Sequence, residues 1–356
     1  MKVVITCGGT GGHIYPALSL ADALKDLENA EILFIGTSDH MEARIIPSYG
    51  YRFASVKAKG LNGSVFNKIT ALLLMLSETI SARKILKQFQ PDITVGFGGY
   101  VSAPVIQASA SLHIPVVLHE QNAFAGKANL YLEKYADAVV AVYENVKNQF
   151  KKKVYLLGNP RTYTALRNKK TGLKKEYGLS AEKKMVLFVM GSQGSESINQ
   201  IMKGVLKELS ERDYEILYVT GESHKDDFKN ETYGSNIHFA SYIDQAGLLP
   251  EVDLIVTRGG ATTASEIAVF KVPSIIIPSP YVPNNHQEVN AQALVDAEAA
   301  VLIREKELDN ERLVKEIDFL INNDKIRQKM AENAGRLGYP HSAEDMIALM
   351  KEIVHE

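Results

Sequence analysis

The chain has 356 residues, of which 46% are hydrophobic and 23% charged, and its formal net charge is −2. At about 150 residues per domain, this length predicts two globular domains with substantial cores. The near-balanced charge argues against a nucleic-acid partner, and the single cysteine, Cys7, excludes an internal disulfide and favours a reducing compartment. No apolar run approaches the roughly 20 residues that span a bilayer, and no signal-peptide pattern precedes the first strand, so we expect a cytoplasmic protein.

Short apolar runs alternate along the chain with longer segments of helical periodicity. They cover residues 3–6, 31–36, 93–97, 115–118, 138–142 and 154–157, and then 185–190, 215–220, 237–239, 254–257, 274–278 and 300–303. Such continuous Val, Ile and Leu runs are typical of strands buried on both faces of a parallel sheet, and helices between them indicate βαβ units. We therefore predict an α/β fold of two Rossmann-like domains, residues 1–158 and 159–341, followed by a last amphipathic helix within 342–356.

The first glycine-rich loop runs from Gly8 to His13, between the first strand and a helix, with the sequence GGTGGH. Glycines let the backbone approach a phosphate, and a helix N-terminus adds N–H groups and the positive end of a dipole. A dinucleotide fingerprint is the rival interpretation; Asp39 could be its ribose-binding acid, but Ile14 falls where that fingerprint needs Gly or Ala. A tight turn without a ligand is the simplest alternative, although four glycines exceed what a turn needs.

Two further polar clusters follow strands of the first domain. Gly98, Gly99 and Tyr100 follow the strand at 93–97, and the sequence HEQN from His119 to Asn122 ends the strand at 115–118. Ligands of open α/β sheets bind outside the carboxyl ends of the strands. These clusters therefore predict a half-site on the first domain, facing an interdomain cleft.

In the second domain, the sequence GSQGS from Gly191 to Ser195 follows the first strand, and RGGATTASE from Arg258 to Glu266 follows the fourth. Small residues and hydroxyls at a helix N-terminus suit a diphosphate, and Glu266 could accept hydrogen bonds from ribose hydroxyls. The alternative is helix capping, with Thr262 or Thr263 as the N-cap and Glu266 completing a capping box.

A Pro-rich loop with the sequence PNNHQEVN, which carries His286 and Gln287, follows the strand at 274–278 and belongs to the same predicted edge. Taken alone, His286 is more often a solvated loop residue than a site residue. A half-site on each domain suits an enzyme with two substrates.

The motifs that are missing narrow the chemistry. The sequence has no Asp-x-Asp, HExxH or CxxC motif and no GxxxxGK[ST] loop. We therefore expect no metal, no cofactor and no ATP hydrolysis. N–H groups, hydroxyls and Arg161 or Arg258 would then stabilise the leaving group.

These motifs together resemble the MurG family of N-acetylglucosaminyltransferases. The match runs in register through GGTGGH at 8–13, HEQN at 119–122 with Gly126 and Asn129, GNP at 158–160, GSQG at 191–194, the stretch 258–266, and HQ at 286–287 before NA at 290–291. The resemblance implies a GT-B fold, with two Rossmann-like domains facing across a cleft, and a last helix that packs back onto the first domain. It also implies inverting transfer of GlcNAc from UDP-GlcNAc to the muramyl 4-hydroxyl of lipid I, which forms lipid II for peptidoglycan.

The motifs and the resemblance together assign residues to the two substrates. Donor binding is assigned to Thr10, Gly11, Gly12, Asn122, Arg161, Ser192, Gln193, Gly194, Ile243, Arg258, Gly260, Ala261, Thr262, Thr263, Ala264, Ser265, Glu266 and Gln287. Acceptor binding is assigned to Gly9, Gly98, Gly99, Tyr100 and Asn129. His13 is the first candidate for the general base, since histidine titrates near neutral pH, and Glu120 is the second.

The chain departs from the family pattern at two places. Arg161 follows Pro160 directly, and the stretch Asn62 to Ser64 replaces basic residues that many members carry. What remains for a membrane is an apolar group with cations nearby: Phe66, Ile69, Leu72, Leu73 and Leu76, with Lys68, Arg83, Lys84 and Lys87. Such a face suits an anionic bilayer surface at the inner side of the plasma membrane, and a core-facing helix is the alternative.

Other functions remain possible at this point. A UDP-GlcNAc 2-epimerase or another glycolipid glycosyltransferase of the same fold is the nearer rival. An NAD(P)-dependent oxidoreductase or a non-catalytic sensor of sugar nucleotides is more distant.

Overall fold

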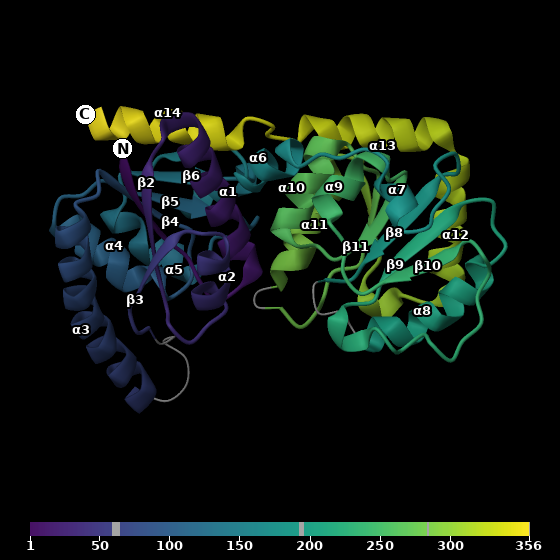
Figure 1. Ribbon diagram of the computed structural model, residues 1–356, viewed down its shortest axis with the longest axis horizontal. Coiled ribbons are helices and arrows are strands. Elements are labelled where there is room, and N and C mark those ends of the chain that lie inside the picture. The colour runs from purple at the N-terminus through teal and green to yellow at the C-terminus, as the bar shows by residue number, and fades with distance from the viewer. Residues whose placement is uncertain (59–64, 192–195, 283–284, 356) are drawn as a thin grey trace. The chain divides into compact units, whose positions relative to one another are not determined.

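The computed structural model describes residues 1–58, 65–191, 196–282 and 285–355 (Figure 1). Contacts divide the chain into a first unit, Met1–Thr164 with Tyr339–Glu356, and a second unit, Ala165–Gly338. The chain first passes between the units six residues after the predicted junction, since the last residue of the first segment is 164 rather than 158. It does so inside a short helix, α6 (Arg161–Arg167).

The first unit is built on a seven-stranded sheet with the order β3-β2-β1-β4-β5-β6-β7, in which every described pair of neighbours is parallel. The strands are β1 (Lys2–Thr6), β2 (Glu31–Gly36), β3 (Arg52–Ser55), β4 (Ile93–Gly96), β5 (Val116–Glu120), β6 (Ala138–Ala141) and β7 (Val154–Leu156). Of these strands, β3 was not predicted. It is a short edge strand whose residues are partly exposed, so it lacks the continuous apolar run that marks its neighbours.

The helices of the first unit are α1 (Gly11–Glu28), α2 (Glu42–Ser48), α3 (Val65–Phe89), α4 (Ser102–Ser111), α5 (Lys127–Leu132) and the C-terminal α14 (Ser342–His355). Figure 1 shows α14, in yellow, beside α1, although the two helices lie at opposite ends of the chain. Met346 and Met350 of α14 are buried in the same core as Val3 and Ile5 of β1 and Leu18 of α1. The last helix is therefore part of the first unit's core.

The second unit is built on a six-stranded parallel sheet with the order β10-β9-β8-β11-β12-β13. Its strands are β8 (Met185–Val189), β9 (Glu215–Val219), β10 (Ile237–Ala240), β11 (Leu254–Thr257), β12 (Ser274–Ile276) and β13 (Ala300–Leu302). Its helices are α7 (Leu173–Glu176), α8 (Glu196–Leu209), α9 (Gln245–Leu248), α10 (Ala261–Phe270), α11 (His286–Asp296), α12 (Asn310–Asn322) and α13 (Asp324–Arg336).

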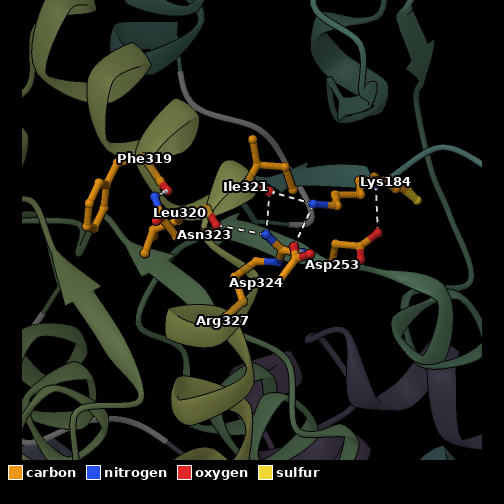
Figure 2. Close-up of polar contacts among 9 residues, drawn as sticks. Lys184, Asp253, Phe319, Leu320, Ile321, Asn323, Asp324 and Arg327 are labelled. Atoms are coloured by element: carbon orange, nitrogen blue, oxygen red, sulfur yellow. Dashed lines mark hydrogen bonds and ion pairs between the residues drawn. The ribbon is translucent and has the colours of Figure 1, made fainter.

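A polar network fixes the junction of α12 and α13 beside the start of β8 (Figure 2). Lys184 Nζ donates to the carbonyl of Ile321 at 3.1 Å and to Asp324 Oδ1 at 2.6 Å. Arg327 Nη1 donates to the carbonyl of Leu320 at 2.9 Å, and Arg327 Nη2 donates to Asp324 Oδ1 at 2.6 Å. Two cations thus satisfy carbonyls at the C-terminal end of α12, where the helix dipole is negative.

The strand orders place the loops that follow the strands. The strand order reverses between β1 and β4 in the first sheet and between β8 and β11 in the second. A crevice outside the carboxyl ends of two such strands is where ligands of open α/β sheets bind. The loops at 8–13 and 98–100 occupy this position in the first unit, and the loop at 258–266 occupies it in the second.

Candidate active site

The first half of the glycine loop between β1 and α1 takes its shape from a buried carboxylate. Gly9 has a φ of +85°, which L side chains rarely adopt, and its N–H donates to Glu42 Oε2 at 3.2 Å. A Cβ on Gly8 would lie 2.7 Å from Glu42 Cδ, so position 8 has no room for a side chain. The fold itself therefore requires these two glycines.

Gly12, in the second half of the loop, has no such reason to be glycine. An added Cβ would meet nothing closer than Thr10 Oγ1 at 3.7 Å, and Gly12 is exposed in the first turn of α1. The side chain of the N-cap, Thr10, forms no capping hydrogen bond, so it does not compete for the N–H groups at the start of the helix. A ligand that approaches the backbone closely would explain why position 12 lacks a side chain.

His13 is held in one tautomer by the same loop. Its Nδ1 lies 2.9 Å from the carbonyl oxygen of Gly8 and 3.3 Å from Thr10 Oγ1. Because a carbonyl can only accept, Nδ1 carries the proton and Nε2 carries the lone pair. The neutral imidazole therefore presents a proton acceptor at Nε2.

The loop after β4 packs against the glycine loop. Gly98 and Gly99 have φ values of +87° and +80°. A Cβ on Gly99 would lie 3.1 Å from the Gly8 carbonyl oxygen and 3.7 Å from His13 Nδ1, and a Cβ on Gly98 would lie 3.4 Å from Asn129 Nδ2. The structure thus brings His13 together with Gly98, Gly99 and Asn129 at one edge of the sheet.

Tyr100, which follows these glycines, is paired with a residue that the sequence analysis did not assign to the site. Its hydroxyl lies 2.6 Å from His40 Nε2. Partial burial, and then the negative charges of Glu42 and Asp39, raise the pKa of Tyr100. Tyr100 therefore stays protonated at neutral pH and presents a hydroxyl beside the loop.

Glu120, the second candidate base, is a buried carboxylate surrounded by donors. Oε1 accepts from Asn122 N at 3.1 Å and Asn122 Nδ2 at 3.3 Å, and Oε2 accepts from Gly126 N and Asn129 Nδ2, both at 2.9 Å. Both carboxylate oxygens are therefore held by donors from the segment that follows β5. The arrangement indicates that Glu120 shapes the segment from 120 to 129.

His119 is fully buried and neutral. Its Nε2 donates to the carbonyl of Gly158 at 3.0 Å, and its ring stacks on Phe97 with centroids 4.9 Å apart. Burial lowers the pKa of His119 to about 4, against the opposing effects of the Gly158 carbonyl and Gln121. Because the proton sits on Nε2 at neutral pH, the residue joins β5 to the segment where β7 ends.

Arg161 lies over the ring of Tyr15 in α1 even though it follows Pro160 directly. The guanidinium carbon is 5.8 Å from the ring centroid of Tyr15, and Nη1 donates to Thr164 Oγ1 at 3.3 Å. A Cβ on Gly11 would itself lie 3.2 Å from the Tyr15 ring. The structure therefore places the cation of Arg161 near the helix that begins at the glycine loop.

In the second unit, the start of α10 is held by the start of α11. A Cβ on Gly259 would lie 2.8 Å from the carbonyl carbon of Gln287, and Asn290 Nδ2 donates to the carbonyl of Gly259 at 3.1 Å. Gln287 Oε1 accepts from Ser279 N at 2.8 Å. Predicted donor residues from two separate loops, Gln287 and those that open α10, thus lie beside each other.

The helix terminus itself differs from the capping alternative. The N-cap of α10 is Gly260, which has no side chain to cap the helix, and Glu266 Oε2 accepts instead from Gln245 Nε2 at 2.7 Å. The buried Thr262 Oγ1 has no hydrogen-bond partner among the described residues. Neither Thr262 nor Thr263 is therefore the N-cap. The Thr262 hydroxyl, at the start of a ten-residue helix, is a candidate hydrogen-bond donor to a ligand.

The contact between Glu266 and Gln245 joins α10 to the segment that follows β10. Ile243 is buried in this segment, two residues before Gln245. Gln245, which was not predicted as a site residue, therefore connects the segment of Ile243 to Glu266. The position of Gln245, a polar residue two places after Ile243, was the sequence signal that could have predicted its role.

The guanidinium of Arg258 contacts other residues of the second unit. Its Nη1 donates to the carbonyl of Ile277 at 3.0 Å and pairs with Glu305 Oε2 at 2.8 Å, and both side chains of the pair are largely buried. This geometry gives Arg258 a role in joining β11 to the ends of β12 and β13. Ser192, Gln193 and Gly194 lie outside the described residues.

In the part of the chain that the structure describes, no group of three or more His, Cys, Asp or Glu side chains is placed to hold a metal ion. Within the same ranges, no helix has the length and apolarity needed to cross a membrane.

Two family models match most of the chain. The model described as the glycosyltransferase family 28 N-terminal domain matches residues 3–141, and the model described as the family 28 C-terminal domain matches residues 185–347. Each match covers one of the two parallel sheets almost completely.

Relatives match along their full length. The chain is 39% identical over 362 residues to the UDP-N-acetylglucosamine–N-acetylmuramyl-(pentapeptide) pyrophosphoryl-undecaprenol N-acetylglucosamine transferase of Lactiplantibacillus plantarum, covering 99% of this chain and 100% of the relative. It is 39% identical over 355 residues to the protein of the same name from Listeria welshimeri, covering 98% of both chains.

Solved structures agree with the predicted fold class, which is confirmed. MurG of Acinetobacter baumannii superimposes with a TM-score of 0.82 at 28% identity and 99% coverage of both chains. UDP-GlcNAc 2-epimerase from Neisseria meningitidis, solved with UDP-GlcNAc, has a TM-score of 0.67 at 16% identity, covering 99% of this chain and 100% of that one. The second likeness shows the fold alone.

Proposed function

The chain belongs to the MurG family of glycosyltransferases, and from this premise we propose that it transfers GlcNAc from UDP-GlcNAc to the muramyl 4-hydroxyl of lipid I. The product, lipid II, is a precursor of peptidoglycan. The observation that carries the proposal is the 39% identity, over the full chain, to transferases named for this reaction. The 2-epimerase shares only the fold at 16% identity, and nothing in the geometry favours an oxidoreductase.

We place the donor on the second unit. The N–H groups at the start of α10 and the Thr262 hydroxyl would bind the diphosphate, and Glu266, positioned by Gln245, would accept from ribose hydroxyls. Ile243 would contact the uracil through its backbone, as the resemblance implies. The first-unit donor residues, Thr10, Gly11, Gly12, Asn122 and Arg161, remain predictions.

We place the acceptor on the first unit, with His13 as the general base. Nε2 takes the proton of the acceptor hydroxyl while that oxygen attacks the anomeric carbon. The bond from the anomeric carbon to the UDP oxygen breaks, and its electron pair leaves with UDP. Attack opposite the leaving group inverts the configuration. Glu120 shapes the acceptor loop in this scheme, because four donors already surround its carboxylate.

A membrane-docking surface on α3 fits a lipid-linked acceptor. Leu72, Leu73, Leu76 and Ile80 are 48%, 61%, 54% and 61% exposed, and α3 lies on the outer side of α4 (Figure 1). The core-facing alternative is wrong for these side chains. The side chains of Phe66, Lys68 and Ile69 lie outside the described residues.

Cations continue the same face of the helix. At 3.6 residues per turn, Arg83, Lys84 and Lys87 lie within the same arc of about 120° as the apolar residues, and all three are exposed. Apolar side chains beside cations favour the interface of an anionic bilayer. We propose that this face binds the inner surface of the plasma membrane.

The test of the reaction is UDP release from UDP-GlcNAc with a soluble lipid I analogue. We expect release only when the acceptor is present, together with a disaccharide product. Sugar conversion without acceptor would favour the epimerase, and no release with an acceptor that another transferase uses would refute the proposal. His13→Ala should lower kcat by about 100-fold or more, with donor binding unchanged; nearly full turnover would exclude His13 as the base.

A further inference from the structure

Glu42 is a buried carboxylate that accepts hydrogen bonds from two backbone N–H groups and one hydroxyl group. Its relative exposure is 0%. Oε1 accepts from Thr37 Oγ1 at 2.5 Å and from Thr37 N at 3.2 Å, and Oε2 accepts from Gly9 N at 3.2 Å. Among the described residues no cation pairs with it. Burying a carboxylate without a counter-ion is costly, so its position in the core calls for a specific role.

The neighbouring backbone is built around this side chain. A Cβ on Gly8 would lie 2.7 Å from Glu42 Cδ, and a Cβ on Gly36 would lie 2.9 Å from Glu42 Cγ. The ends of β1 and β2 thus both leave room for the carboxylate. The contacts hold Glu42 in one place between the two strand ends.

The peptide group between Gly8 and Gly9 links Glu42 to His13. The N–H of this peptide, on Gly9, donates to Glu42 Oε2, and its carbonyl, on Gly8, accepts from His13 Nδ1 at 2.9 Å. A trans peptide is planar, so its N–H and C=O point in opposite directions. Fixing the N–H at Glu42 therefore aims the carbonyl at the imidazole.

We propose that Glu42 is a positioning residue that acts on His13 through the Gly8–Gly9 peptide. The carboxylate orients the peptide, and the peptide orients the imidazole and selects its tautomer. A hydrogen bond to an anion also polarises the peptide and strengthens its carbonyl as an acceptor. The positive charge that develops on His13 during proton transfer is then stabilised from the Nδ1 side.

This inference rests on the proposed role of His13 as the base, and a double-mutant cycle separates the two claims. Glu42→Gln is isosteric and removes the charge, and its amide cannot accept from both Thr37 and Gly9. We expect a drop in kcat of about 10-fold with native His13, and a shift of the acidic limb of the kcat–pH profile to lower pH, because a less stabilised imidazolium has a lower pKa. In the His13→Ala background, Glu42→Gln should change the residual kcat by less than twofold.

The outcomes are distinct. An equal loss in both backgrounds, or no loss with native His13, would overturn the role of Glu42. Full turnover of His13→Ala would overturn the base assignment itself. If the Gln variant fails to fold, Glu42→Asp can be used instead, because it keeps the charge. It should lower kcat and leave the acidic limb of the kcat–pH profile in place. An acidic limb that moves to lower pH although the charge is retained would contradict the mechanism. The Kd for UDP-GlcNAc should stay within twofold in every variant.

Discussion

Replacing Gly12 with alanine should stabilise the protein and impair the enzyme. Position 12 is exposed in the first turn of α1, and an added Cβ would meet nothing closer than Thr10 Oγ1 at 3.7 Å. The native fold can therefore accept a methyl group without strain. Alanine in a helix is favoured over glycine by about 0.5–1 kcal/mol, so Gly12→Ala should raise the free energy of unfolding by up to that amount.

The same methyl group would stand where a phosphate approaches the start of the helix. A displaced phosphate loses a hydrogen bond to a charged group, which is worth about 1.5–3 kcal/mol, or roughly 10- to 100-fold in kcat/KM. Unfolding followed by circular dichroism at 222 nm gives the stability. Turnover with donor and acceptor varied separately shows which of the two phosphate groups is affected.

Gly8→Ala is the matched control, since its Cβ would clash with the buried Glu42. This variant should lose both stability and activity. Full activity in Gly12→Ala would refute the idea that the second half of the loop faces a phosphate. A loss of stability in Gly12→Ala would refute the claim that the fold leaves position 12 unconstrained.

Four further outcomes are expected. Glu266→Gln should weaken UDP-GlcNAc binding by about 10-fold or more in calorimetry, because a charged acceptor for ribose hydroxyls is lost; an unchanged Kd would remove the assignment. The pKa of His119 falls from 6.5 to about 4 on folding, so the native state binds fewer protons in this window and stability should decrease by about 2 kcal/mol from pH 7.5 to 5. Urea unfolding checks this, and His119→Gln should flatten the dependence. Leu76→Glu with Ile80→Glu should weaken binding to anionic vesicles by about 100-fold or more, at unchanged turnover of a soluble acceptor. EDTA should leave turnover unchanged, because in the proposed donor site N–H groups and hydroxyls, rather than a metal ion, would hold the diphosphate.

Most of the fold follows from the sequence because parallel strands buried on both faces read as continuous apolar runs. β3 escaped this rule as a partly exposed edge strand with Arg52 and Ser55 at its ends. The loops at 8–13 and 98–100 could be placed at one edge of the first sheet because carboxyl ends of parallel strands share that edge. The contacts of side chains could not be predicted so well: nothing in the sequence indicates that Arg258, a predicted donor ligand, pairs with Glu305.

Glu42 shows why the remainder escapes sequence analysis. It lies 33 residues from Gly9 in the sequence, and nothing in its local pattern distinguishes it from an ordinary acidic residue in the first turn of α2. Only the tertiary fold brings it under the glycine loop. A side chain at position 8 would clash with Glu42, which explains Gly8 without the phosphate that the glycine-rich sequence suggested.

The two buried glutamates of the first unit, Glu42 and Glu120, determine which backbone N–H groups are left for a ligand. Glu42 takes the N–H of Gly9, and Glu120 takes that of Gly126, so a second anion at either N–H would meet a like charge. The N–H groups of Gly11 and Gly12 open a helix of 18 residues, where no intrahelical partner exists and the dipole is positive. We therefore expect an anionic substrate to bind at the second half of the loop, next to the imidazole that the first half holds in place.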